Sequence, residues 1–153
     1  MNQVAIHRKK KRELEIKRTV EILEESFLSN SNAKYRILEF GAGSCDQVPF
    51  LSKIGDVTAI DIYTHSGIDL NKINFVECSV TDTPFEDETF DIIYSNHVIA
   101  HIGESRKHDL KDAFDEIFRV GKKDCLYVFA VPTQTWLILS VPAHYASLAM
   151  SAW

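Results

Sequence analysis

Two glycines and two acidic residues stand at spacings that suit a cofactor containing ribose. Glu39 precedes Gly41 and Gly43, and Asp61 lies 20 residues after Gly41. Glycines permit a tight turn and let the backbone approach a ligand closely. An acidic residue at the end of the next strand accepts hydrogen bonds from both ribose hydroxyls. The spacing therefore predicts a site that binds a ribose beside a glycine loop.

Two classes of cofactor use this arrangement, and the acidic residues distinguish between them. A dinucleotide needs a third glycine so that its pyrophosphate lies on the helix N-terminus, whereas the residue three positions after Gly43 is Asp46. The charges of Asp46 and Glu39 would repel a pyrophosphate. S-adenosylmethionine has no phosphate, and its sulfonium and ammonium groups suit acidic neighbours. The residues therefore favour S-adenosylmethionine, and an NAD-dependent oxidoreductase remains the second alternative.

The elements that must position these residues alternate between apolar strands and amphipathic helices. We expect strands at residues 35–40, 57–62, 74–78, 90–95 and 125–131, and helices at 5–28, 46–54 and 106–119. Short apolar strands between helical segments are typical of a parallel sheet buried on both faces. The sequence predicts an α/β fold, a three-layer sandwich around a mainly parallel sheet with the first strand at its centre. The short connection between Asp61 and Asn74 favours a loop over a full helix.

Five segments together carry a resemblance to a known family. They are residues 37–43, 59–61, 83–91, 95–102 and 116–120. Through them, residues 35–132 resemble a class I S-adenosylmethionine-dependent methyltransferase of the small-molecule methyltransferase-domain group. The resemblance implies a Rossmann-like sheet and S-adenosyl-L-methionine as the cofactor.

The resemblance also implies roles for residues of the glycine loop and the second strand. Gly41 and Gly43 would lie under the methionine and ribose part of the cofactor. Glu39 would orient that loop or reach the ammonium group. Asp61 would bind the ribose hydroxyls, and Ile62 would pack against adenine.

A second group of residues is implied at the adenine end and the methyl end. The family often places an acidic residue five positions before the proline, here Pro84, to contact the adenine amino group, and this chain has Ser79 there. The Ser79 hydroxyl and the Val80 N–H would then serve the adenine. Asn96 would lie where the methyl group and the acceptor meet. His101 matches a histidine of the following helix and is the candidate general base.

The C-terminal part departs from the family pattern. Class I methyltransferases usually carry two further strands as an antiparallel hairpin, and the 22 residues after Val131 show no clear strand–turn–strand pattern. We therefore expect the hairpin to be missing and the chain to be truncated at its C-terminus. The domain prediction is an N-terminal helix and linker at 1–32, an S-adenosylmethionine-binding domain at 33–132 and an apolar tail at 133–153.

Charge and composition limit the partners. The net charge is -5, although the first 18 residues hold seven Lys/Arg. An acidic body argues against a nucleic-acid partner, whose phosphates need basic contacts. The apolar tail predicts association with a protein partner or a second copy, with folding back over the sheet edge as the alternative and membrane contact as the least favoured case. Cysteines and histidines without metal-ligand spacing, and the lack of a secretory signal, predict a cytoplasmic protein with no metal.

The predicted function is direct in-line methyl transfer to a small-molecule or saccharide-type acceptor, which needs positioning rather than a covalent intermediate. The saccharide interpretation comes from residues 132–136, which resemble the region after the fifth strand in methyltransferases of surface-polysaccharide pathways. The alternative is a cofactor-binding but catalytically inactive or regulatory subunit. It is motivated by the expected lack of a hairpin and by Ser79 and Ala100, which replace acidic residues of the family pattern.

Overall fold

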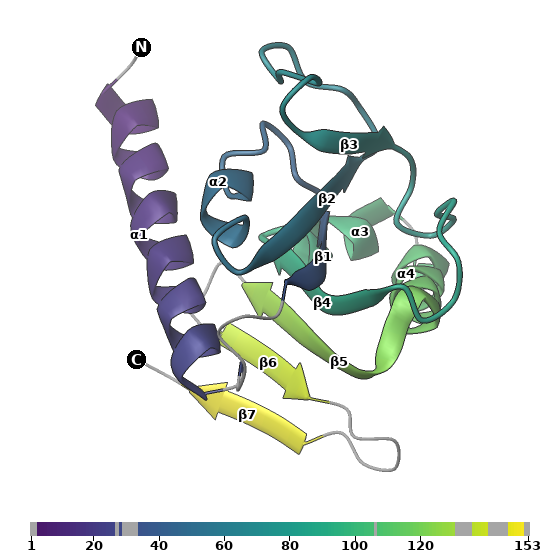
Figure 1. Cartoon of the computed structure of the whole chain (residues 1–153). Coiled ribbons are helices and arrows are strands. Elements are labelled where there is room, and N and C mark those ends of the chain that lie inside the picture. The colour runs from purple at the N-terminus through teal and green to yellow at the C-terminus, as the bar shows by residue number, and fades with distance from the viewer. Residues whose placement is uncertain are drawn as a thin grey trace.

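The computed structural model describes residues 3–26, 28, 34–105, 107–130, 136–140 and 147–151. The strands are β1 (Tyr35–Phe40), β2 (Gly55–Asp61), β3 (Asn74–Glu77), β4 (Phe90–Asn96), β5 (Gly121–Ala130), β6 (Trp136–Ser140) and β7 (Ser147–Ser151). The helices are α1 (Gln3–Ser26), α2 (Val48–Leu51), α3 (Ile99–Ser105) and α4 (Lys107–Val120). All seven strands belong to one sheet in the order β3-β2-β1-β4-β5-β6-β7, with helices on both of its faces (Figure 1).

The five N-terminal strands form the predicted parallel sheet. β1 pairs in parallel with β2 on one side and with β4 on the other, and β3 and β5 extend the sheet outward. The consecutive β1 residues Ile37 and Leu38 face opposite sides of the sheet, and both are fully buried. A strand with apolar side chains on both faces is stable only when helices cover both. The predicted α/β sandwich, with the first strand central among the parallel strands, is confirmed.

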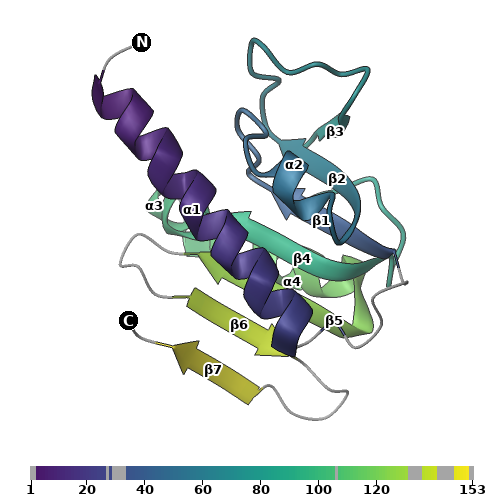
Figure 2. The same ribbon diagram turned by 60° about the vertical axis from the view of Figure 1, so that its left-hand side comes forward.

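Two apolar clusters hold the helices against the sheet. Ile16, Val20 and Leu23 of α1 recur at spacings of four and three, and they pack on one face together with residues of α2. α4 packs on the other face through Ile117 and Val120. Figure 2 shows α1 lying across the sheet on the side opposite α4. The core is therefore split into two layers by the sheet.

Some predicted boundaries differ from the observed ones. The helix expected at residues 46–54 is only the short α2, which has Pro49 in its first turn and is flanked by turns. A proline lacks the N–H that a helix interior uses, so it belongs at the start of a helix. The segment after Asp61 contains bends and turns and no helix before β3, as its length predicted.

The predicted absence of a C-terminal hairpin is wrong. β6 pairs antiparallel with β5, and β7 pairs antiparallel with β6. The physical reason is that the outer edge of β5 presents backbone N–H and C=O groups that another strand satisfies, whatever its side-chain pattern. Part of the predicted apolar tail, residues 133–135, 141–146 and 152–153, lies outside the described residues. The division of domains at residues 32 and 132 stays a prediction.

Candidate cofactor site

The carboxyl ends of β1, β2 and β4 meet at one edge of the sheet. β1 lies between the other two strands, and all three run in the same direction. The order of strands along the chain reverses at this position. In open α/β sheets, ligands bind in the crevice beyond the strand ends at such a switch point. The topology therefore brings the residues after Phe40 next to Asp61 and Asn96.

The glycine loop after β1 comes unusually close to the segment after β4. Gly41 has φ +67°, and a Cβ placed on it would lie 2.2 Å from Cγ2 of Val98. Gly43 has φ +54°, but a Cβ there would meet nothing within 4 Å. Gly41 is thus required by both its backbone conformation and its contact, whereas Gly43 is required by its conformation alone.

Asp61 joins the end of β2 to the glycine loop. The Gly43 N–H donates to Oδ2 of Asp61 over 2.7 Å, and His65 Nε2 lies 4.0 Å from the same oxygen. The Asp61 side chain is 14% exposed. Among the described residues, none donates a hydrogen bond to Oδ1. One carboxylate oxygen therefore holds the loop, and the other is left to accept from a ligand.

Glu39 is an acidic side chain buried beneath this loop. It is 1% exposed, and within the described part of the chain its Oε2 has no hydrogen-bond partner. Burial, followed by the negative charges of Asp46 and Asp61, raises the pKa of Glu39 from 4.5 to about 8. Tyr94 Oη and Asn96 Oδ1, on the neighbouring β4, are also buried without partners. Orphaned acceptors of this kind suit a ligand that carries N–H donors and positive charge.

A pocket of about 420 Å³ opens at the same strand ends. Six of the residues singled out from the sequence line it, namely Gly41, Asp61, Ile62, Ser79, Val80 and His101. Glu39, Gly43 and Asn96 are not part of its lining. The apolar wall of the pocket, formed by Phe40, Ile60, Val98 and Ile102, was not predicted from the sequence. Their apolar character alone resembles that of any core position, so the sequence held no separate signal for them.

Asp46 has basic neighbours that the sequence analysis did not foresee. Its carboxylate oxygens lie 3.5 Å from Lys9 Nζ and 3.8 Å from Arg12 Nη2, both on α1. These cations reduce the negative potential at the loop. In the folded chain, Asp46 would therefore repel a pyrophosphate less strongly than the sequence alone indicates.

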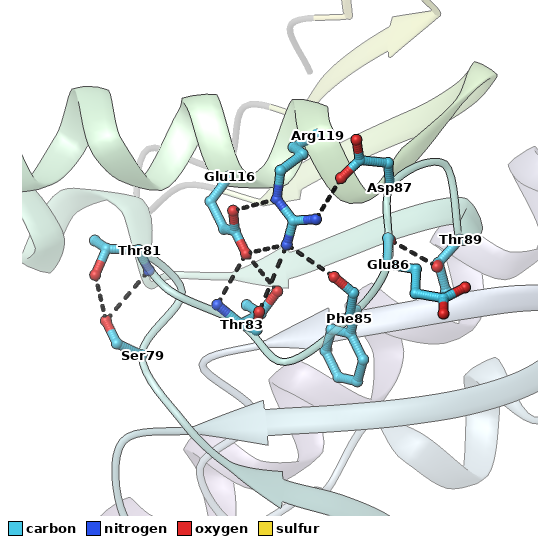
Figure 3. A network of polar contacts seen from close by, with 9 residues as sticks. All are labelled: Ser79, Thr81, Thr83, Phe85, Glu86, Asp87, Thr89, Glu116 and Arg119. Atoms are coloured by element: carbon cyan, nitrogen blue, oxygen red, sulfur yellow. Dashed lines mark hydrogen bonds and ion pairs between the residues drawn. The ribbon is translucent and has the colours of Figure 1, made fainter.

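A polar network anchors the loop between β3 and β4, which supplies Ser79 and Val80 to the pocket (Figure 3). Glu116 Oε1 on α4 accepts from the Thr83 N–H over 2.8 Å and from the Thr83 hydroxyl over 2.6 Å. Arg119 donates to Glu116 and to the Phe85 carbonyl, and it pairs with Asp87. These bonds explain why residues 83–91 and 116–120 both belong to the recognisable pattern: one segment holds the other.

The two histidines near β4 differ in placement. His101 is exposed on α3 and lines the pocket. Its backbone N–H donates to the Val98 carbonyl over 2.8 Å. His97, which the sequence analysis did not select, has φ +61° and lies with Nε2 3.9 Å from Oε2 of Glu15 on α1. The positive φ, rare for a residue with a Cβ, is visible only in the structure.

Two general features complete the description. Within the described ranges, no group of three or more His, Cys, Asp or Glu side chains is arranged to hold a metal ion. In the same part of the chain, no helix combines the length and apolar character needed to cross a membrane.

Comparison with known proteins assigns the fold. Residues 38–129, more than half of the chain, match a family model described as a methyltransferase domain. The chain belongs to the methyltransferase-domain family. The comparison with curated proteins finds no match.

Solved structures share the fold of this methyltransferase domain at low sequence identity. The YcgJ protein from Bacillus subtilis is 20% identical with a TM-score of 0.58, and the match covers 73% of this chain and 49% of that one. An S-adenosylmethionine-dependent methyltransferase from Aquifex aeolicus is 22% identical with a TM-score of 0.57, and the match covers 72% and 62%. The 1,6-didemethyltoxoflavin-N1-methyltransferase of Burkholderia thailandensis, with bound 1,6-didemethyltoxoflavin and S-adenosylhomocysteine, is 18% identical with a TM-score of 0.59, and the match covers 89% and 60%. The matched part thus spans between 49% and 62% of the length of these proteins.

The predicted resemblance to class I S-adenosylmethionine-dependent methyltransferases is confirmed. S-adenosylmethionine is the cofactor that the family and its structural neighbours indicate. The site fits this cofactor. One oxygen of the buried Glu39 carboxyl lacks a partner among the described residues and suits an ammonium, Asp61 beside the glycine loop suits a ribose, and the largely apolar pocket suits a base. The family assignment leaves the oxidoreductase alternative without support.

Proposed function

We propose that this methyltransferase domain binds S-adenosylmethionine at the β1, β2 and β4 strand ends and methylates a small-molecule or saccharide-type acceptor. The observation that carries the proposal is Asp61. Its carboxylate secures the glycine loop through one oxygen and keeps the other beside a pocket of about 420 Å³. A ribose is the part of the cofactor whose two vicinal hydroxyls such a carboxylate binds.

Each further residue has a place in this proposal. Ile62 and Val80 provide apolar contact for adenine in the pocket, and Glu39 accepts from the cofactor ammonium. Gly41 and Gly43 let the backbone approach the methionine part, and Asn96 lies at the methyl end. S-adenosylmethionine supplies a methyl group that its sulfonium has already activated. The chain itself therefore needs only to bind, orient and exclude water.

On the acceptor side, we assign proton removal to His101. It lines the pocket from α3 and is exposed, so a hydroxyl acceptor can reach it. We expect His101→Gln to lower turnover of a hydroxyl acceptor by about 10²- to 10⁴-fold, with cofactor affinity unchanged. Unchanged turnover would reject this assignment.

Isothermal titration calorimetry tests the cofactor site without an acceptor. We expect Asp61→Ala to weaken binding of S-adenosylmethionine about 10- to 150-fold, because a charged hydrogen-bond acceptor is lost. Asp56→Ala is the matched control, since Asp56 lies at the opposite end of the same strand and is exposed. Equal affinity of the Asp61 variant and the parent would refute the placement of the ribose.

A catalytically inactive or regulatory subunit is the second candidate function, favoured by the neutral Ser79 in the pocket. Mass-spectrometric screening of sugar, lipid-linked and small-acid acceptors with a labelled methyl donor separates the two. The Burkholderia neighbour, which bears a small-molecule acceptor in its name, supports including small heterocycles. Turnover by the chain alone would reject the inactive-subunit alternative.

Association through residues 133–153 and a cytoplasmic location complete the proposal. We expect the full chain to form a homo-oligomer or to bind a protein partner, and light scattering of the full chain and of a version ending at Thr133 tests the first case. We do not expect a nucleic-acid partner, because the chain has a net charge of -5.

A further inference from the structure

Ser79 and Thr81 form a hydroxyl pair in the lining of the pocket. Their Oγ and Oγ1 atoms lie 2.7 Å apart, and either one is a possible donor. The Thr81 N–H also donates to Ser79 Oγ over 3.2 Å, and the Asp82 N–H donates to the Ser79 carbonyl over 3.2 Å. Both residues line the pocket, and Figure 3 shows the two hydroxyl groups pointing toward each other. The pair is therefore held in place at the pocket wall.

The rest of the loop keeps this pair from moving. Two residues after Thr81, both the N–H and the hydroxyl of Thr83 donate to Glu116 on α4. Arg119 holds the same loop further on through the Phe85 carbonyl and Asp87. A ligand at the pocket wall thus meets two preset hydroxyl groups rather than a mobile loop.

The hydroxyl pair is neutral, so it recognises a ligand amino group differently from a carboxylate. A carboxylate only accepts hydrogen bonds, so it selects a ligand amino group and is left unsatisfied without one. A hydroxyl donates or accepts according to its rotation, and the one hydrogen bond within this pair leaves a second O–H hydrogen and several lone pairs for a ligand. Among the side chains that line the pocket, Asp61 is the only carboxylate, and it lies at the end of β2. Asp82 is exposed and does not line the pocket.

A negative residue at position 79 would also meet unfavourable neighbours. Burial and the charges of Asp82 and Glu116 raise the pKa of the adjacent Cys78 thiol. Two carboxylates therefore already lie near this part of the loop, one of them paired with Arg119. A serine avoids adding a further carboxylate at this point.

We propose that the Ser79–Thr81 pair makes the pocket indifferent to the 6-amino group of the purine. Shape and apolar contact then select a purine nucleoside, and the group at position 6 contributes little. The inference rests on the proposed function, because it requires the adenine of the cofactor to occupy this pocket.

The test compares two ligands by calorimetry on the full chain. One is S-adenosylhomocysteine, and the other is its analogue in which unsubstituted purine replaces adenine. We expect the affinities to differ by less than about tenfold, because a hydrogen bond between a neutral hydroxyl and the amino group adds little net affinity. In Ser79→Asp, the preference for S-adenosylhomocysteine should rise at least about fivefold above that of the parent. Asp82→Asn is the matched control and should leave the ratio unchanged.

The outcomes of these titrations separate the inference from the proposed function. Three outcomes overturn the inference and leave the proposed function standing. They are a tenfold or larger difference between the two affinities in the parent, an unchanged ratio of these affinities in a folded Ser79→Asp, and a ratio that falls in Asp82→Asn. Failure of S-adenosylhomocysteine itself to bind overturns both. If thermal unfolding shows that Ser79→Asp does not fold, Ser79→Ala replaces it. Its ratio must then stay below tenfold.

Discussion

Glu39 shows how one buried carboxyl ties the site to the stability of the fold. It lies at the end of the central strand, is 1% exposed and has an oxygen without a partner. Burial and two acidic neighbours raise its pKa to about 8. Because the folded-state pKa lies above the ordinary 4.5, the protonated carboxyl contributes stability that is fully present below about pH 4.5 and is lost as the pH rises through about 8.

Replacing this carboxyl by an amide should remove that dependence on pH. We expect Glu39→Gln to match the parent at pH 5 and to be more stable by about 2–4 kcal/mol at pH 9. Denaturant unfolding at the two pH values measures the difference. Glu24→Gln, an exposed change on α1, is the control and should shift neither value. An equal gain at pH 5 and pH 9 would contradict the assigned pKa.

The two loop glycines predict different costs for the same substitution. Gly41→Ala places a Cβ 2.2 Å from a Val98 methyl at φ +67°, and we expect it to destabilise the fold by about 2–4 kcal/mol. Gly43→Ala has open space and should cost only about 1–2 kcal/mol for its left-handed conformation. Thermal unfolding compares the two. Adding Val98→Ala to the Gly41 variant should restore part of the stability, and no recovery would argue against the contact.

At the scale of elements, α4 and the β3–β4 loop act as one unit through Glu116. Its side chain is 11% exposed, and hydrogen bonds from Arg119 and Thr83 lower its pKa from 4.5 to about 2. Since the folded-state pKa is lowered, the ionised carboxylate contributes stability that is present above about pH 4.5 and is lost as the pH falls through about 2.

We expect Glu116→Gln to destabilise the chain by about 1–3 kcal/mol at pH 7, since charged hydrogen bonds to Arg119 are lost. The difference from the parent should shrink as the pH falls below about 4.5. Urea unfolding across this range is the measurement. Asp115→Asn is the control on the same helix, because its solvent-exposed pair with Lys111 should contribute little to stability. An equal loss of stability in the two variants would mean that the hydrogen bonds of Glu116 to Thr83 and Arg119 stabilise the fold no more than an exposed ion pair does.

At the scale of the whole molecule, α1 contacts the rest of the chain through apolar and ionic groups, which contribute unequally to the free energy of unfolding. Ile16 and Leu23 are fully buried, whereas the Lys9 and Arg12 pairs with Asp46 are half exposed on the basic side. Buried apolar area contributes far more than screened surface charge. We conclude that the helix is held by its apolar stripe.

Two variants measure this difference directly. We expect Leu23→Ala to cost about 2–4 kcal/mol, and Asp46→Asn less than about 1 kcal/mol. Urea unfolding at low salt and in the presence of about 1 M salt provides the comparison, since salt screens only the ionic part. A larger loss for Asp46→Asn than for Leu23→Ala would show that charge docks the helix.

Much of the parallel sheet and the cofactor frame was predictable from the sequence. In residues 35–40 the buried positions are apolar except for Glu39, and this local pattern has few alternatives to a buried strand. Strands β6 and β7 were not predicted, because their pairing depends on the free edge of β5, which is a distant feature. The pocket wall of Val98 and Ile102 was likewise invisible as a site.

The sequence by itself determined the alternation of elements and the frame of Glu39, Gly41 and Asp61, since these follow from periodicity and spacing along the chain. Only the tertiary structure decided which groups lack partners and which are neutralised. Among the described residues, Oε2 of Glu39 has no partner, whereas Asp46 lies near cations of α1 and Glu116 holds a loop 33 residues away. The reason is that burial and pairing depend on neighbours brought together by folding, and the energy of a charge depends on those neighbours more than on its own identity.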